Sequence, residues 1–431
     1  MKNDLLNPLI AGLAGVLLGL PAFAADLDWS IESTVGHTDN ATRVETNEVS
    51  DTIGSIGGHI DLKRDGSRVN GRLRVDGSFR EYFDDTYDSE FLGSGAANLR
   101  LGLIGDSLTW SFDDTFGQVL TDTFEPSTPE NRENVNVFST GPDLRLRLSG
   151  STEVVIRGRY DDARYQDSDS VDSQRVAGDI ALVRHVSAAT AWSIHAGSSS
   201  IDFDAPGNSG YDLHEIFARL ETTSTQQKLT VDVGLEILDS SDQDDQAPIV
   251  RLDWMRKLSP SWQLELGLSS EFRDASDQFV SGIASAPQLG GTQDVDLTGQ
   301  SFRDDNASLG LRFVRPRTTF RLFSDVGKET YSDVDGQDRE HWSIGAEASR
   351  RLTPRLEATL RARHEDRSYD VTIGDDQTDS YGLRLDWRVG KAVFLGAEGR
   401  HEKRSGDTAF GYSETIYLAS ISYRPGADQQ H

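Results

Sequence analysis

The sequence predicts an all-β fold, a transmembrane antiparallel up-and-down β-barrel of about 18–20 strands. Apolar and polar residues alternate with period two through most of the chain, as in strands with one wet and one apolar face. Short turns alternate with long polar loops, which is typical of barrels in the bacterial outer membrane. After the N-terminus, no apolar run in the 431 residues approaches the ~20 that a membrane-spanning helix needs.

We expect residues 1–24 to be a secretory signal peptide. Lys2 supplies positive charge, residues 9–20 are apolar, and Ala22 and Ala24 form a small-residue cleavage signal. An N-terminal anchor is the alternative, but the apolar run is shorter than a span requires. Cleavage after Ala24 leaves a barrel over residues 25–424, in the bacterial outer membrane, and a short periplasmic tail over residues 425–431.

The first predicted strand illustrates the alternation. Leu27, Trp29 and Ile31 share one face, whereas Asp28 and Ser30 share the other. Helical periodicity is not evident anywhere after the signal peptide. The same period-two pattern recurs at residues 69–79, 143–148, 229–237, 262–268 and 356–363.

The connections set the orientation. Short turns contain Gly, Pro, Asp and Ser, which tight turns require. The first connection, residues 37–50, is long, so an N-terminus in the periplasm makes the long loops extracellular and the short turns periplasmic. A β-propeller is the alternative. Four strands per blade would need more turn signals than are present, and one strand face here is repeatedly Arg and Asp.

The last predicted strand, residues 415–423, ends in an aromatic residue. Its apolar face resembles the assembly signal of outer-membrane barrels, which predicts the barrel-assembly machinery as a partner. The residues of this signal are Tyr417, Ala419, Ile421 and Tyr423.

Composition excludes several functions. The formal net charge of −28 argues against nucleic acid as a partner, and the absence of Cys excludes disulfides and thiolate metal sites. The nine His are scattered and form no metal or hydrolase motif. We therefore expect no enzymatic activity, no cofactor and no metal ion.

Residues 27–62 carry a resemblance to a known family. The segment runs from a strand through Thr38-Asp39-Asn40 and a polar loop to residues 50–53 (SDTI) and a second strand. The acidic, aromatic connection at residues 82–91 (YFDDTYDSEF) fits the same pattern. It resembles the start of the β-barrel porin 2 type of proteobacterial outer-membrane protein. It is also similar to barrels that accompany exopolysaccharide and PEP-CTERM sorting systems. The resemblance implies an outer-membrane barrel and exopolysaccharide secretion components as partners, but no catalytic residues.

Many arginines fall on the face predicted to line the lumen. Because a guanidinium keeps its charge and binds carboxylate or phosphate, these residues suggest a path for anionic solutes or an acidic polysaccharide. The alternative, which we favour, is that they pair with lumen carboxylates and stabilise the wall. The candidates are Arg72, Arg74, Arg100, Arg145, Arg147, Arg157, Arg159, Arg251, Arg361, Arg363 and Arg384.

The longest loop, residues 273–298, is unusually apolar for an extracellular loop. It contains Phe279, Val280, Ile283 and Leu289. We expect it to fold into the lumen as a constriction.

Two functions remain open from the sequence. The first is a water-filled channel for passive diffusion or export of polar solutes, including anionic solutes or polysaccharide. The second is a non-conducting structural or adhesive surface barrel with acidic, cation-binding loops. Either barrel would lie among outer-membrane lipid and lipopolysaccharide.

Overall fold

A computed structural model describes residues 25–204, 210–240, 244–285, 292–295, 297, 299–331, 338–370, 375–406 and 410–425. The predicted signal peptide, Leu289 and residues 426–431 of the tail lie outside these residues.

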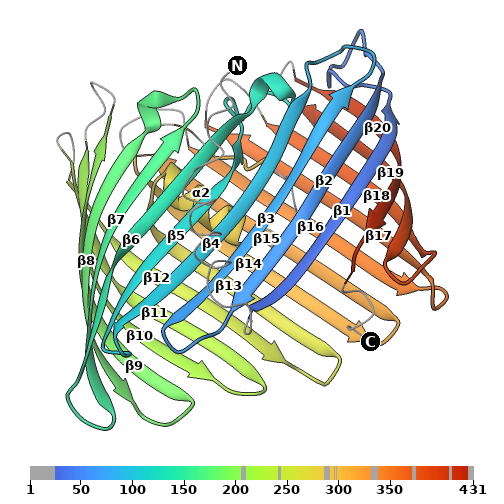
Figure 1. Ribbon diagram of the computed structural model, residues 1–431. Helices are drawn as coiled ribbons and strands as arrows, with labels where there is room; N and C mark the ends of the chain where they lie inside the picture. The colour runs from blue at the N-terminus through green and yellow to red at the C-terminus, as the bar shows by residue number, and fades with distance from the viewer. Residues whose placement is uncertain are drawn as a thin grey trace.

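The described chain forms one 20-stranded antiparallel sheet (Figure 1). This confirms the predicted all-β barrel. The strands are β1 (Ala25–Thr38), β2 (Asp51–Arg64), β3 (Val69–Tyr82), β4 (Glu90–Ile104), β5 (Leu108–Val119), β6 (Glu133–Arg147), β7 (Thr152–Tyr165), β8 (Ser173–His185), β9 (Thr190–Phe203), β10 (Tyr211–Thr223), β11 (Gln227–Ser240), β12 (Asp244–Lys257), β13 (Trp262–Arg273), β14 (Phe302–Arg315), β15 (Thr318–Tyr331), β16 (Arg339–Arg351), β17 (Leu356–Tyr369), β18 (Asp376–Arg388), β19 (Val393–Gly406) and β20 (Tyr412–Tyr423).

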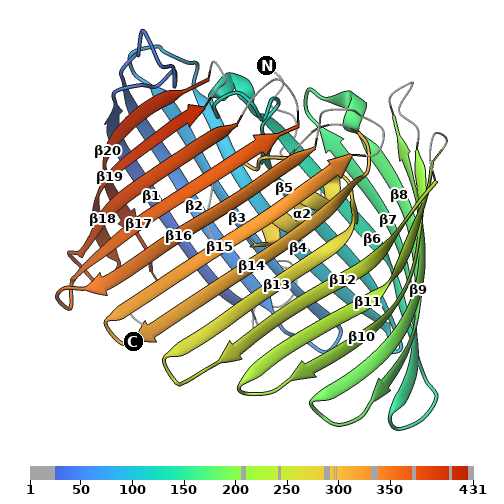
Figure 2. The same ribbon diagram turned by 180° about the vertical axis from the view of Figure 1, so that it is seen from behind.

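The sheet closes on itself. Each strand pairs with the next in sequence, and β20 returns to β1, with a register from Ile31 opposite Tyr423 to Thr38 opposite Ile416 (Figure 2). Closure satisfies the backbone groups that an open edge would leave without partners in hydrocarbon. The residues of the predicted assembly signal therefore lie on β20, the strand that closes the barrel against β1.

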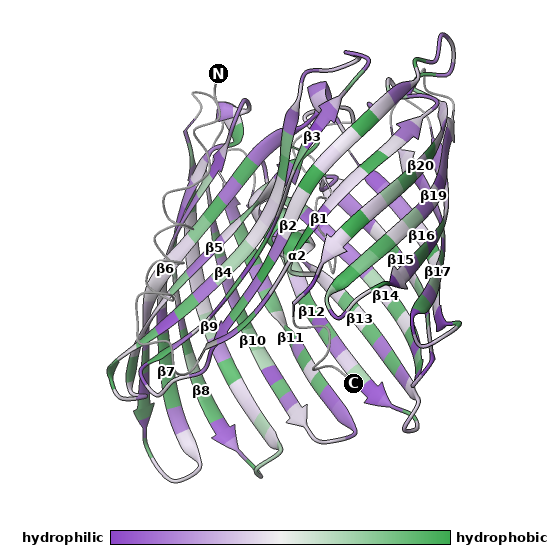
Figure 3. Cartoon of the chain, turned by 45° about the vertical axis from the view of Figure 1, so that its right-hand side comes forward, coloured by the Kyte–Doolittle hydropathy of each residue, from purple (hydrophilic) through white to green (hydrophobic). Residues whose placement is uncertain are grey.

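Hydrophilic and hydrophobic residues alternate along the strands, as the sequence pattern predicts (Figure 3). In β9, Trp192 and Ile194 are 40% and 48% exposed, whereas the intervening Ser193 and the following His195 are 4% and 3% exposed. Large apolar side chains thus point away from the lumen and are exposed on the outside of the barrel. This arrangement is stable when hydrocarbon surrounds the barrel.

One helix was not predicted. The prediction that no helix follows the signal peptide was wrong for residues 275–285, which form α2 (Ala275–Ser285). The helix is short and lies in a loop, and its apolar residues Ala275, Phe279 and Ile283 follow a four-residue spacing on one face. No helix in the described part of the chain is long and apolar enough to cross a membrane.

The wall is altered where the chain leaves it to form this helix. The ladder between β12 and β13 ends at Val250 opposite Ser270, although β13 continues to Arg273. Beyond that point, Glu236 of β11 accepts the backbone N–H of Phe272 at 2.9 Å, and Arg303 of β14 donates to the carbonyl of Pro248. Beyond the end of the β12–β13 ladder, side chains therefore satisfy backbone groups that the ladder leaves without partners.

Candidate functional site: the lumen and its inward segment

The described residues between β13 and β14 enter the barrel. Both ribbon views place α2 between the front and back walls (Figures 1 and 2). Asp274 caps the helix, because its carboxylate accepts the backbone N–H of Asp277 at 3.0 Å and the hydroxyl of Ser276 at 2.6 Å. We call the described residues of this connection, 274–285, 292–295, 297 and 299–301, the inward segment.

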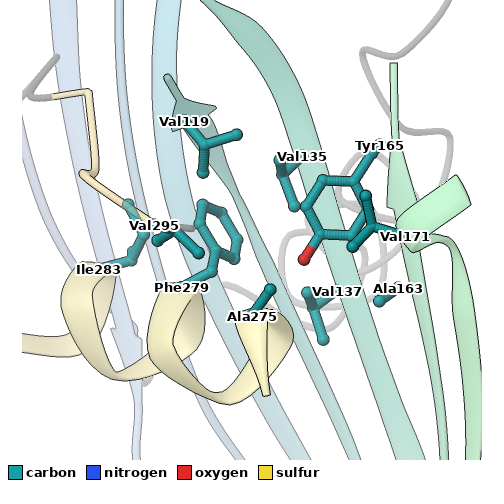
Figure 4. Packing of buried hydrophobic residues seen from close by; sticks show 10 residues of the cluster. All are labelled: Val119, Val135, Val137, Ala163, Tyr165, Val171, Ala275, Phe279, Ile283 and Val295. Atoms are coloured by element: carbon teal, nitrogen blue, oxygen red, sulfur yellow. The ribbon is translucent and has the colours of Figure 1, made fainter. Parts of the chain in front are cut away.

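The apolar face of α2 packs against the lumen wall (Figure 4). Phe279 is fully buried and Ile283 is 5% exposed, while Val280 is partly buried beside them. The wall contributes the inward-facing apolar residues of β5, β6 and β7. The remaining members of this cluster are Val119, Val135, Val137, Ala163, Tyr165, Val171, Ala275 and Val295.

The N-terminus of α2 is fixed to β8 by charge. The guanidinium of Arg175 lies 2.7 Å from the carboxylate of Asp274 and 2.8 Å from that of Asp277. The hydroxyl of Tyr211 donates to Asp274 at 2.9 Å. Burial alone would raise the pKa of Asp274, but Arg175 and the hydrogen bonds outweigh it and lower the pKa. Burial raises the pKa of Asp277.

The chain after α2 is fixed to the opposite wall. Asp294 lies 3.0 Å from the guanidinium of Arg339 in β16 and also pairs with Arg367 in β17. Burial would raise the pKa of Asp294, but the two guanidiniums together lower it. The adjacent Gln293 bonds through its backbone to the end of β5, donating to the carbonyl of Gln118 at 2.8 Å. The inward segment therefore spans the lumen between two walls.

Space remains beside the segment. One lumen cavity of about 600 Å³ lies between α2 and strands β12 to β17, with Gln278 and Asp294 on its segment side and Arg251, Asp325 and Arg363 on its wall side. A second cavity of about 920 Å³ lies against β1 to β3 and β16 to β20 and reaches the turn that contains Arg355. Both cavities contain side chains of both charges.

The strand registers place the predicted arginines on the inner face, where most of them pair with carboxylates. Arg157 lies 2.6 Å from Asp179, and Arg159 lies 2.6 Å from Asp143. Pairs of this kind join neighbouring strands and stabilise the wall. The other pairs found for predicted arginines are Arg72 with Asp61, Arg145 with Glu153, Arg251 with Glu215, Asp232 and Glu271, Arg361 with Glu347, Arg363 with Glu365, and Arg384 with Glu32, Asp386 and Glu398.

The two ends of the barrel carry opposite charge. The long loops are rich in Asp and Glu, whereas Lys and Arg dominate the short turns and the strand ends next to them. The basic residues of this end are Lys63, Arg64, Arg68, Arg147, Arg184, Lys228, Arg256, Lys257, Arg315, Arg317, Arg350, Arg351, Arg355, Arg388, Lys391 and Arg424. A chain of net negative charge therefore presents a basic rim at the end predicted to be periplasmic.

The acidic loops do not gather into a metal site in the part of the chain that is described. No group of three or more His, Asp or Glu side chains there is placed to hold one ion. Arginine instead binds two loop carboxylates: Arg164 pairs with Asp172 at 3.2 Å and with Asp204, and also with Asp162 of its own strand at 2.8 Å.

Three side chains of the barrel wall, Ser193, His195 and Asp179, are hydrogen-bonded in the order found in Ser-His-Asp hydrolases. The hydroxyl of Ser193 lies 2.9 Å from His195 Nε2, and His195 Nδ1 lies 3.2 Å from Asp179. However, β9 is paired on both sides by β8 and β10, so its backbone N–H groups belong to the sheet and do not converge as an oxyanion hole. Ser193 and His195 are almost fully buried, and His195 stacks on Phe217 at 4.5 Å between ring centroids. The geometry fits wall packing.

Comparisons with known proteins show resemblance in fold only. No family model matches the chain, and no curated protein matches it. A ferric enterobactin receptor (PfeA) variant from Pseudomonas aeruginosa is 9% identical with a TM-score of 0.46, over 92% of this chain and 80% of that chain. The FrpB iron transporter from Neisseria meningitidis (F3-3 variant) is 9% identical with a TM-score of 0.48, over 95% and 83%. The siderophore receptor PirA from Acinetobacter baumannii is 6% identical with a TM-score of 0.44, over 93% and 80%.

Proposed function

We propose that the chain is a transport barrel of the bacterial outer membrane, with a lumen that passes polar solutes and is narrowed by the inward segment. The observation that carries this proposal is the way the segment is held. It packs by apolar contact on β5 to β7 and by ion pairs on β8, β16 and β17. A segment fixed across the lumen at both walls limits what passes without filling the cavities of about 600 and 920 Å³.

The barrel size supports a channel. Barrels of 16–18 strands already leave an aqueous lumen, and this sheet has 20 strands. The lumen side chains are polar and of both charges, which suits hydrated solutes. We further propose that Phe279, Val280, Ile283 and Leu289 belong to the constriction, as the sequence predicts.

We place the barrel among outer-membrane lipid and lipopolysaccharide, inserted by the barrel-assembly machinery through Tyr417, Ala419, Ile421 and Tyr423. The outward and exposed position of Tyr417, Ile421 and Tyr423 supports this role, because these side chains are free to face lipid. A relation to the β-barrel porin 2 type, and exopolysaccharide secretion components as partners, remain proposals that rest on residues 27–62.

The alternative, a non-conducting surface barrel with cation-binding loops, is supported less well. It requires loop carboxylates that are available to cations. Arg164 already engages two of them, Asp172 and Asp204. Carboxylates at the adjoining strand ends are paired as well: Arg43 engages Glu414 at 2.9 Å and Glu402 at 3.4 Å.

Efflux from proteoliposomes tests the proposal. The wild-type barrel and a variant lacking residues 279–289 are reconstituted with trapped neutral oligosaccharides of graded size. We expect the wild-type barrel to release the small sugars, and the deletion to raise the size limit, because the docked helix no longer obstructs the lumen. Equal retention of all sugars by both proteins would contradict a transport role.

A point variant separates loss of docking from deletion of chain. Phe279→Asp combined with Ile283→Asp places two charges in the apolar contact and should also raise the size limit. The matched control is Ser281→Asp, because Ser281 is exposed on the same helix and makes no part of the apolar cluster.

A further inference from the structure

Resting on the proposed transport role, we propose that Arg361 and Arg400 form a binding site for an anionic group, carboxylate or phosphate, on solutes in the lumen. The two arginines lie on β17 and β19, on either side of Gly382 in β18. The registers place Arg361 opposite Gly382 and Gly382 opposite Arg400, so the three residues form one row on the inner face. We call this arrangement the Arg361–Arg400 notch.

Gly382 leaves the space between the two arginines empty. A Cβ added at this glycine would meet only the carbonyl of Gly399 at 3.9 Å and the Cβ of Arg361 at 4.0 Å. Neighbouring strands lie about 4.8 Å apart, so the backbones of Arg361 and Arg400 are separated by roughly 10 Å. Two long guanidinium side chains can both reach a single oxyanion placed between them.

Arg400 is available to a ligand. Its side chain is exposed to the lumen, and it forms no ion pair with any described carboxylate. The carboxylates nearest to it in sequence are already engaged: Glu398 lies 3.3 Å from Arg384, and Glu402 accepts the hydroxyl of Tyr412 at 2.6 Å and pairs with Arg43. Arg361 is held by Glu347 at 3.0 Å, which orients it without closing the notch.

The entrance to the notch is basic. Arg361 and Arg400 both line the cavity of about 920 Å³, which extends to Arg355 and Arg388 at the basic rim. The cavity also contains carboxylates such as Glu398, but the arginines at the rim raise the local concentration of anions at its entrance. The notch is thus the place where an anion entering from this rim meets two guanidiniums with no side chain between them.

Equilibrium binding to the purified full-length barrel tests the site at low ionic strength. The probes are trigalacturonate, which carries sugar carboxylates, inorganic phosphate, and neutral maltotriose. We expect trigalacturonate, phosphate or both to bind wild-type protein, whereas maltotriose should bind less. The stronger of the two anions then identifies carboxylate or phosphate as the preferred group.

Two variants locate the binding. Arg400→Gln should weaken anion binding by about ten-fold, because a charge-assisted contact is lost. Gly382→Glu should weaken it at least as much, because the added carboxylate occupies the notch. The matched control is Gly150→Glu, which adds the same charge in a distant turn where nothing lies within 4 Å. It should bind within two-fold of wild type.

Either of two outcomes would overturn the site: no anion binding above the level of maltotriose, or unchanged binding in Arg400→Gln. Heat-modifiable mobility on gels shows that each variant is folded, and Arg400→Gln keeps the test decisive if Gly382→Glu does not fold. Anion binding that depends on Arg400 in a barrel without solute efflux would retain the site and reject the proposed transport role.

Discussion

Asp294 holds the chain after α2 to β16 and β17 through two ion pairs. Its two partners do not rely on it, because Arg339 also lies 2.7 Å from Glu329 and Arg367 lies 3.0 Å from Asp376. Removing the charge of Asp294 therefore releases the segment without leaving a buried guanidinium unpaired, which would itself be costly.

We predict that Asp294→Asn loosens the inward segment while the barrel stays intact. The chain contains no Cys, so a single spin label at Ser281 and a second on the wall report the position of α2. The distance distribution should broaden relative to wild type. The exposed pair Lys328–Glu340 supplies a control: Glu340→Gln should leave the distribution unchanged. A narrow, wild-type distribution in Asp294→Asn would refute this role.

Acid should release the inward segment only when the pH falls below the ordinary pKa range of an Asp carboxyl. The pKa values of Asp274 and Asp294 are lowered in the fold, so their ion pairs stabilise the docked state above pH ~4 and are lost as pH falls through the lowered values. The raised pKa of Asp277 has the opposite sign, since its protonation favours the folded form. The label distances should therefore be constant from pH 7 to 5 and change below pH 4. Release near pH 6 would be inconsistent with these pairs.

At the scale of the element, α2 is held by its apolar face more than by its helix propensity. It has 11 residues, which is marginal for an isolated helix. Phe279 is fully buried within the cluster on β5 to β7. The helix therefore depends on the wall for its conformation.

We predict that Phe279→Ala destabilises the docked helix by about 3 kcal/mol. Amide hydrogen exchange in residues 275–285 should accelerate, while exchange in the barrel strands stays slow. Val280→Ala is the control and should have a smaller effect, because Val280 is only partly buried. Equal exchange in α2 for the two variants would show that the apolar contact does not hold the helix.

The sequence predicted the strands better than the inward segment, for physical reasons. Period two is local, so strands such as β1 and β11 are visible in their own residues. The apolar loop residues Phe279 and Ile283 were recognised, but the helix was not, because Ser276, Ser281 and Gly282 weaken its pattern. The partners of Asp294, Arg339 and Arg367, are 45 and 73 residues away in sequence, so no local pattern reveals these pairs.

At the scale of the whole molecule, closure between β1 and β20 defines the barrel. Without β20, the edges of β19 and β1 would expose backbone groups to hydrocarbon, at a cost of several kcal/mol per group. We predict that a chain ending at residue 411 gives no heat-modifiable band on gels. A chain ending at residue 425, which keeps β20, should behave as the full chain does. A folded barrel without β20 would refute the closure.

Single-channel current in a planar bilayer tests the central claim, a lumen that conducts and is constricted by the inward segment. We predict discrete steps for the wild-type barrel and steps at least two-fold larger for the variant lacking residues 279–289. Single-channel currents that are absent from both proteins, although both run as folded barrels on gels, would contradict the claim.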